Sequence, residues 1–163
     1  MTETTLRPAV AADLPVIFRA ERDYIKTIEP GQEAAWTAGL DRSLELWTAN
    51  LDRATMLLAG TEVAGFVIWK PTPEYQDGAA TLVTIQVHPA YRRRGYGRIL
   101  LRVFADQAAA AGYRLLHLGV HKGNPARALY EQAGYQQVGT DGDYLLYDLA
   151  TSAAQRNGSR PAS

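Results

Sequence analysis

The sequence predicts an α/β (α+β) fold in which a mixed, mostly antiparallel sheet of six to seven strands is flanked by helices. Short β-branched, apolar runs alternate with segments whose apolar residues recur at helical spacing. Glycine and proline clusters separate these segments and mark the turns. The resulting order of expected elements is β-α-α-β-β-β-α-β-α-β-β, which places helices on both faces of one sheet.

The first half of the chain supplies the first strands and two of the helices. Asp13 is expected to cap the first helix, with Pro15 near its start. Trp36 and Trp47 lie eleven residues apart in the second expected helix and therefore share a face. We expect that face to pack onto the sheet, with an aromatic wall for an acceptor as the alternative. The expected elements are a strand at 6–9, helices at 14–25 and 33–51, and a hairpin of 54–59 and 63–69.

The second half begins after a proline-containing loop at 71–80. Residues 81–87 are β-branched and apolar, so they predict a central strand. Gly112 is expected to end the following helix, as glycine commonly does. The remaining expected elements are a helix at 98–111, a strand at 115–120, a short helix from about 125 to 134, and a closing hairpin of 135–138 and 144–149.

Length and composition set bounds on the class of protein. The chain has 163 residues, of which 47% are hydrophobic and 21% charged, as in globular proteins. We expect a single domain over residues 1–150. Residues 151–163 are rich in Ser, Ala, Gly and Arg without periodicity, so we expect a disordered tail there.

Charge and cysteine content exclude several functions. Lys+Arg and Asp+Glu both number 17, so the net charge is zero, which argues against a nucleic-acid partner. The absence of cysteine excludes disulfides, a thiol nucleophile and cysteine-ligated metals. We expect no metal site. No apolar run reaches the length of a membrane span and no signal peptide is visible, so we expect a cytoplasmic protein without a membrane partner.

The segment from Val87 to Leu101 is the most informative part of the chain. It predicts a strand that stops at Pro89, a basic turn with two glycines, and a helix. Backbone N–H groups of such a turn, together with the positive end of the helix, bind phosphate or pyrophosphate. A dinucleotide-binding loop would need a third glycine where Leu100 stands, and the P-loop pattern is absent. A basic surface turn and a nucleic-acid patch are the remaining alternatives.

This turn resembles the pyrophosphate loop of the GNAT superfamily of acyl-CoA N-acyltransferases, written [R/Q]-x-x-G-x-[G/A] and matched here by Arg92–Gly97. A second family signature, an Asn followed by L-Y-x-x-x-G-[F/Y], is matched by residues 124–135. The resemblance implies that strands four and five splay apart and admit acetyl-CoA as cosubstrate. The residues that it implies for the cofactor are Ile85, Gln86, Val87, Arg92, Arg93, Arg94, Gly95, Tyr96, Gly97, Arg98, Asn124 and Tyr130.

The resemblance also implies a catalytic residue, Tyr130, as the general acid that protonates the leaving thiolate. A phenol of ordinary pKa is protonated at neutral pH and can make this donation. A packing role is the alternative for Tyr130. A helix-capping role is the alternative for Asn124, since Pro125 follows it.

No general base is assigned from the sequence. Many relatives carry a Glu on strand four, where this chain has only Thr84, Gln86 and His88. His88 is expected to be structural, and histidines in or beside a strand are more often satisfied than catalytic. The groups left open as a base, directly or through water, are His117, His121, Glu21, Asp23, Glu74, Asp77 and Asp143.

The sequence therefore predicts an acetyl-CoA-dependent N-acetyltransferase that acts on a primary amine by direct transfer in a ternary complex. The acceptor, a small molecule or a protein amine, is not identified. A non-catalytic acyl-CoA-binding regulatory module is the alternative, favoured by the missing strand-four carboxylate and opposed by Tyr130. Homodimers are common in the resembling family, and the sequence leaves a homodimer open.

Overall fold

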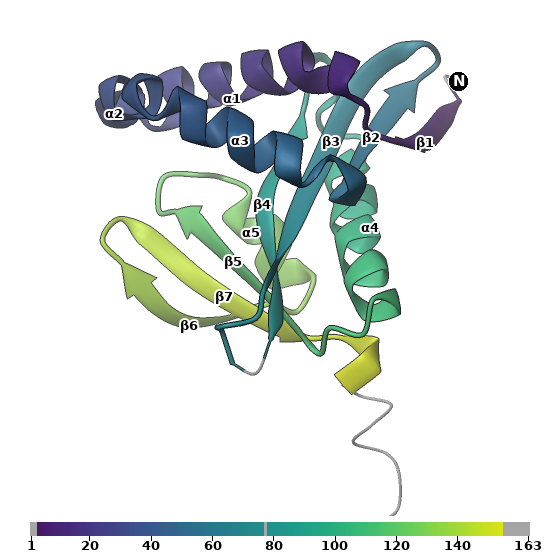
Figure 1. The fold of residues 1–163 in the computed structure, drawn as a ribbon, viewed down its shortest axis with the longest axis vertical. Coiled ribbons are helices and arrows are strands. Elements are labelled where there is room, and N and C mark those ends of the chain that lie inside the picture. The colour runs from purple at the N-terminus through teal and green to yellow at the C-terminus, as the bar shows by residue number, and fades with distance from the viewer. Residues whose placement is uncertain (1–2, 77, 155–163) are drawn as a thin grey trace, which may run out of the picture. The chain divides into compact units, whose positions relative to one another are not determined.

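The computed structural model describes residues 3–76 and 78–154. Seven strands form a sheet with the order β1-β2-β3-β4-β5-β7-β6 (Figure 1). The β1–β2, β2–β3, β5–β7 and β6–β7 pairs are antiparallel, and the β4–β5 pair is parallel. The prediction of a mixed, mostly antiparallel sheet of six to seven strands with flanking helices is confirmed.

The helices and strands follow the expected order with one addition among the helices. The strands are β1 (Thr4–Pro8), β2 (Ala54–Ala59), β3 (Glu62–Thr72), β4 (Ala79–Val87), β5 (Leu115–His121), β6 (Gln136–Asp141) and β7 (Tyr144–Ala150). The helices are α1 (Leu14–Ile28), α2 (Glu33–Ala38), α3 (Leu40–Ala49), α4 (Tyr96–Ala110) and α5 (Arg127–Gln132).

The expected helix at 33–51 is wrong as a single element. Gly39 ends α2 and precedes α3, and glycine is a poor helix former in a helix interior. Trp36 and Trp47 therefore lie on different helices, so the argument that they share one face fails. Trp36 stacks on Phe18 of α1 with ring centroids 5.9 Å apart, whereas Trp47 is buried.

Asp13 also differs from its expected role. It precedes α1 directly, but its side chain makes no capping hydrogen bond to that helix. Instead, its carboxylate pairs with the guanidinium of Arg7 at 2.8 Å and accepts from the backbone N–H of Val10. The hydrogen bond from Arg7 lowers the pKa of Asp13 below its usual range. The residue therefore fastens the connection after β1.

The chain divides into two compact units. The first comprises Met1–Ile68 and Thr84–Leu100, and the second comprises Trp69–Val83 and Leu101–Ser163, each to the extent described. In the first unit, α1 packs against both α2 and α3. Its core contains Ile17, Trp47, Met56, Phe66, Ile68 and Leu100.

The second unit contains strands β5, β7 and β6, which lie next to one another (Figure 1). Its core contains Phe104, Ala108, Leu116, Leu118, Val120 and Tyr147. Gly112 has a φ of +93° just beyond α4, and the N–H of Tyr113 bonds the carbonyl of Ala108, so the expected glycine end of this helix is confirmed. Thr151 is buried, while residues 155–163 of the expected tail lie outside the described residues.

None of the helices within residues 3–76 and 78–154 combines the length and the apolar character that crossing a bilayer requires.

Candidate functional site

The basic turn after β4 has the backbone form of an anion seat. Arg93 has a φ of 64° and Gly95 a φ of 80°, so both are left-handed, and α4 begins at Tyr96. Left-handed residues in a turn direct successive N–H groups toward one side, where they can surround an anion. The first turn of a helix adds N–H groups that have no acceptor within the helix. A Cβ on Gly95 would meet no atom within 4 Å, so this glycine provides its backbone conformation and leaves open space above the turn.

The side chains of the turn surround this seat with positive charge. Arg92, Arg93, Arg94 and Arg98 are all exposed. The Arg92 Nε donates to the carbonyl of Val87 at 3.4 Å, and the Arg94 guanidinium lies 5.4 Å from the centre of the Tyr91 ring. A guanidinium carries five N–H donors, so it can make a structural contact and still bind phosphate.

Two tyrosines anchor the turn. Tyr96 is buried at the start of α4, and its ring stacks on that of Tyr91 with centroids 6.3 Å apart. The Tyr91 hydroxyl donates to the Glu62 carboxylate of β3 at 2.6 Å. The imidazole Nδ1 of His88 accepts the N–H of Ala90 at 3.2 Å. This hydrogen bond supports the predicted structural role of His88.

The end of β4 is drawn tightly against β3 in the first unit. The N–H of His88 donates to the carbonyl of Ala64 at 2.8 Å. A Cβ on Gly65 would lie 2.5 Å from the carbonyl oxygen of Gln86 and 3.1 Å from a methyl group of Leu100. Glycine is therefore required at position 65 for the backbones to approach this closely. The sequence analysis did not identify this role.

Pairing between β4 and β5 is short. Among the described residues it covers three pairs, from Ala79 with Leu115 to Thr81 with His117, in a strand of nine residues. Ile85, Gln86 and Val87 lie beyond these pairs and belong to the first unit. All three are half-buried, and their role in holding the cofactor stays a prediction.

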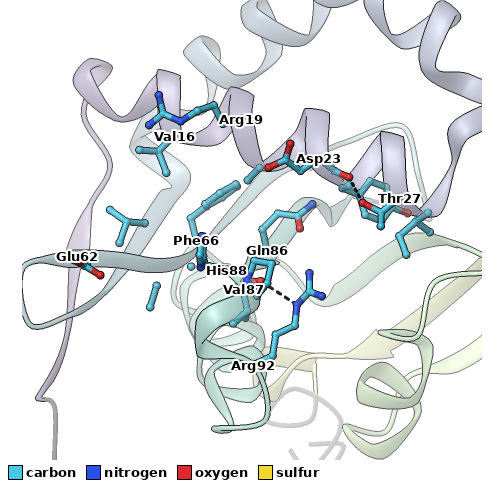
Figure 2. A pocket seen from close by; sticks show the side chains of 17 residues that line it. Val16, Arg19, Asp23, Thr27, Glu62, Phe66, Gln86, Val87, His88 and Arg92 are labelled. Atoms are coloured by element: carbon cyan, nitrogen blue, oxygen red, sulfur yellow. Dashed lines mark hydrogen bonds between the residues drawn. The ribbon is translucent and has the colours of Figure 1, made fainter.

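A cavity of about 630 Å³ opens in the first unit between α1 and the end of β4. Figure 2 shows Gln86, Val87, His88 and Arg92 on one side and Arg19, Asp23 and Thr27 of α1 opposite. The structure thus places Gln86 and Val87 of strand four and Arg92 of the basic turn around one cavity, and their contact with a cofactor stays a prediction. The volume of this cavity lies within the range typical of small-molecule sites.

The Glu21 carboxylate lies next to Gln86, and the sequence had left Glu21 among several candidates for the general base. Glu21 of α1 accepts a hydrogen bond from the Thr84 hydroxyl, and the Gln86 Nε2 lies 3.4 Å from the same carboxylate oxygen. Burial raises the pKa of Glu21 to about 6, more than the hydrogen bonds from Thr84 and Gln86 lower it. Helix α1 therefore places a carboxylate against Thr84 and Gln86 of β4.

The other signature residues lie in the second unit. Tyr130 on α5 is 4% exposed, and burial raises its pKa above the usual range of a phenol. Its ring meets that of Tyr135 edge to face, with centroids 6.1 Å apart. The Asn124 Oδ1 accepts the N–H of Ala126 at 2.9 Å, directly before α5. This bond supports the capping role of Asn124, while its contact with a cofactor stays a prediction.

Helix α5 is tied to β7 by three side chains that the sequence analysis missed. The buried Tyr147 hydroxyl donates to Glu131 at 2.8 Å and accepts from the Arg127 Nε at 3.1 Å. Arg127 and Glu131 also pair at 3.0 Å. Their spacing of four residues on a helix was a usable signal for this pair. The network fixes the helix that carries Tyr130.

The expected acid–base candidates on β5 are engaged in hydrogen bonds. The His117 Nδ1 lies 2.6 Å from an Asp148 oxygen, and the other Asp148 oxygen accepts from the Tyr75 hydroxyl at 2.9 Å. The Tyr75 and His117 rings pack with centroids 4.2 Å apart. The His121 Nδ1 accepts the N–H of Gly123. Both histidines thus have partners, as expected for satisfied histidines.

The remaining carboxylates give no comparable site. Asp143 pairs with Lys122 at 3.0 Å, and the hydrogen bond from Lys122 lowers the pKa of Asp143. Asp23 is exposed on α1 at the cavity, and Glu74 is exposed in the loop. Asp77 lies outside the described residues.

Comparison with known proteins gives a consistent result. The profile of the Acetyltransferase (GNAT) family matches residues 19–135. The chain is 33% identical over 82 residues to a [Ribosomal protein bS18]-alanine N-acetyltransferase of Haemophilus influenzae, covering 50% of this chain and 53% of that protein. It is also 33% identical over 86 residues to a mycothiol acetyltransferase of Streptosporangium roseum, covering 52% of this chain and 23% of that protein. The chain thus spans about half the length, or less, of these curated relatives.

Its fold is also that of a solved structure. A PaiA N-acetyltransferase from Thermoplasma acidophilum, solved in complex with coenzyme A, superimposes with a TM-score of 0.75. The comparison covers 91% of this chain and 99% of that one, at 18% identity.

Proposed function

We propose that this chain, which belongs to the GNAT acetyltransferase family, is an acetyl-CoA-dependent N-acetyltransferase that acetylates a primary amine by direct transfer in a ternary complex. The observation that carries the proposal is the turn at 92–97, where left-handed Arg93 and Gly95 precede the start of α4. This turn falls inside the region matched by the family profile. Its N–H groups and arginines would hold the pyrophosphate.

The transfer needs three proton movements besides the exchange of the carbon–sulfur bond for a carbon–nitrogen bond. An ammonium acceptor first loses a proton, and its nitrogen then forms a bond to the thioester carbonyl carbon while the carbon–sulfur bond breaks. The departing thiolate takes up a proton, and the nitrogen loses a second one to solvent, which in turn reprotonates the group that donated to the thiolate. Tyr130 is proposed to donate to the departing sulfur, because its buried phenol stays protonated through the physiological pH range.

The acceptor is proposed to be a primary amine of a protein or a small molecule. The bS18-alanine N-acetyltransferase relative supports including a peptide with an N-terminal alanine among the candidates. The mycothiol acetyltransferase relative matches a similar length of this chain, so the matches do not single out one acceptor.

Binding and turnover test this proposal together. Acetyl-CoA is titrated by calorimetry into the wild type and into Gly97→Glu, which places a carboxylate beside the anion seat. Gly31→Glu is the matched control. A Cβ on Gly31 would meet no atom within 4 Å, and Gly31 lies in a different turn, so the same change there should be tolerated and should leave the anion seat unaffected. Alanyl peptides, lysyl peptides and small amines are then added while thiol release is measured.

The expected result is binding to the wild type and to Gly31→Glu, a loss of at least tenfold in Gly97→Glu, and thiol release with one class of amine. Binding without release for any amine would favour the regulatory acyl-CoA-binding module. Absence of binding to the wild type would overturn the proposal.

A further inference from the structure

Strand β4 has no acidic residue, but the Glu21 carboxylate of helix α1 lies against it. Thr84 and Gln86 are half-buried in the last part of that strand, and neither can accept a proton as a base at neutral pH. Both side chains direct hydrogen-bond donors to the same oxygen of Glu21. Glu21 is therefore held in place by two groups from the strand, although it precedes them by more than sixty residues.

The groups that hold Glu21 are neutral, which sets it apart from an ion pair. No salt bridge to Glu21 occurs within residues 3–76 and 78–154. Burial is the largest influence on its pKa, and the buried carboxylate of Glu29 at the end of α1 raises that pKa further. The other charged groups of α1 and of the cavity are Arg19, Arg22, Asp23, Lys26, Glu62, His88 and Arg92.

The cavity adjoins one of the two side chains that hold this carboxylate. Gln86 lines the cavity, and its amide nitrogen also faces Glu21. Figure 2 shows the Gln86 side chain extending toward α1, with Asp23 above it and Thr27 to its right. Glu21 itself does not line the cavity, so an amine there would meet Gln86 first. A water molecule bound by the Gln86 amide would link such an amine to Glu21, since general bases act either directly or through one water molecule.

We propose that Glu21 is the general base of the acetyl transfer, taking the proton of the acceptor ammonium through one water molecule positioned by Gln86. This inference rests on the proposed function. The proton leaves the ammonium nitrogen for the water, and the water passes a proton to the Glu21 carboxylate. The resulting neutral amine attacks the thioester carbon, and Glu21 returns its proton to solvent after the thiol has left.

The test is the dependence of kcat/KM on pH, measured with one accepted amine, for the wild type, Glu21→Gln and Thr84→Val. The wild type is expected to lose activity as pH falls through about 6, because a protonated Glu21 cannot accept a proton. Glu21→Gln is expected to lower kcat/KM at pH 7 by about 10²-fold and to remove this decrease at low pH, the acidic limb of the profile. The affinity of this variant for acetyl-CoA should stay unchanged. Thr84→Val removes a hydrogen bond that lowers the pKa of Glu21, so its limb should move to higher pH.

Glu45→Gln is the matched control, since it makes the same change at an exposed position on α3 and should leave the profile unchanged. His117→Gln tests the rival base in the second unit. The inference is overturned if Glu21→Gln keeps full activity and the acidic limb, or if the limb disappears with His117 instead. A wild type that releases no thiol with any amine refutes the proposed function itself, which is a distinct result.

Discussion

The half-buried carboxylates of the two units have different hydrogen-bond partners. In the first unit, Glu21 is held by the neutral donors of Thr84 and Gln86. In the second unit, Asp148 is held between His117 and Tyr75, and the ring of His117 packs on that of Tyr75. A half-buried carboxylate can thus either remain a proton acceptor or orient an imidazole, and the partners decide which.

Burial also has opposite chemical consequences in the two units. It favours the uncharged form of any ionisable group. For Glu21 this raises the pKa to about 6, near the pH at which a base works best. For Tyr130 burial also raises the pKa, so the phenol keeps its proton and is a hydrogen-bond donor rather than a strong acid. These pKa shifts support the proposed roles, in which Glu21 accepts a proton and Tyr130 supplies one to the departing thiolate.

The largest expected effect comes from removing that donor. Tyr130→Phe should lower kcat by about 10²-fold or more while the calorimetric affinity for acetyl-CoA stays within twofold. The acidic limb that is assigned to Glu21 should remain, because the two groups act on different protons. Unchanged turnover in Tyr130→Phe would show that Tyr130 only packs, and the proposed assignment of the proton donor to the second unit would be wrong.

The backbone of the basic turn could be predicted from the sequence, whereas the surroundings of Glu21 could not. Glycines, Pro89 and the arginines lie within a few residues of one another, so local spacing was enough to predict the turn and the start of the next helix. The partners of Glu21 are 63 and 65 residues away, and helical periodicity shows only which face of α1 is apolar. The same limit explains Gly65, whose closest neighbour is the backbone of another strand.

Errors in the expected elements have local causes. The apolar spacing of 33–51 continues through Gly39, so periodicity alone joined two helices that the backbone separates. Asp13 was expected to be a cap because of its residue type and position, but Arg7 on β1 competes for the same carboxylate. In both cases a contact or a backbone preference outside the pattern determined the outcome.

A smaller effect, on stability, tests the state of Glu21 without any substrate. Its pKa is raised on folding from an ordinary 4.5 to about 6, so the folded protein binds the proton more tightly than the unfolded chain does. The contribution of Glu21 to the stability of the wild type should therefore fall by about 2 kcal/mol as pH rises through this interval, at 1.36 kcal/mol per pKa unit. Glu21→Gln cannot titrate, so the mutant should gain about that much relative to the wild type between pH 4 and pH 7.5.

Urea unfolding at several pH values measures this difference directly. Comparing the two proteins at each pH removes the constant cost of changing the hydrogen bonds to Thr84 and Gln86. Glu45→Gln should follow the wild type at every pH. A difference between Glu21→Gln and the wild type that stays constant from pH 4 to pH 7.5 would show that Glu21 has an ordinary pKa, and the comparison between the units would lose its basis.

The smallest expected effect is on the free energy of unfolding, and its sign should differ between two buried tyrosines of the second unit, Tyr135 and Tyr147. The Tyr135 hydroxyl is buried without a hydrogen-bond partner among the described residues, whereas the buried Tyr147 hydroxyl bonds Glu131 and Arg127. An unsatisfied buried hydroxyl costs about 1 kcal/mol or more, so Tyr135→Phe should raise the free energy of unfolding by about 1 kcal/mol. Tyr147→Phe should lower it by about 1–2 kcal/mol, since two partners lose their hydrogen bond. If urea unfolding shows that Tyr135→Phe destabilises the protein, then the Tyr135 hydroxyl has a hydrogen-bond partner in the folded protein, and the contrast with Tyr147 is wrong.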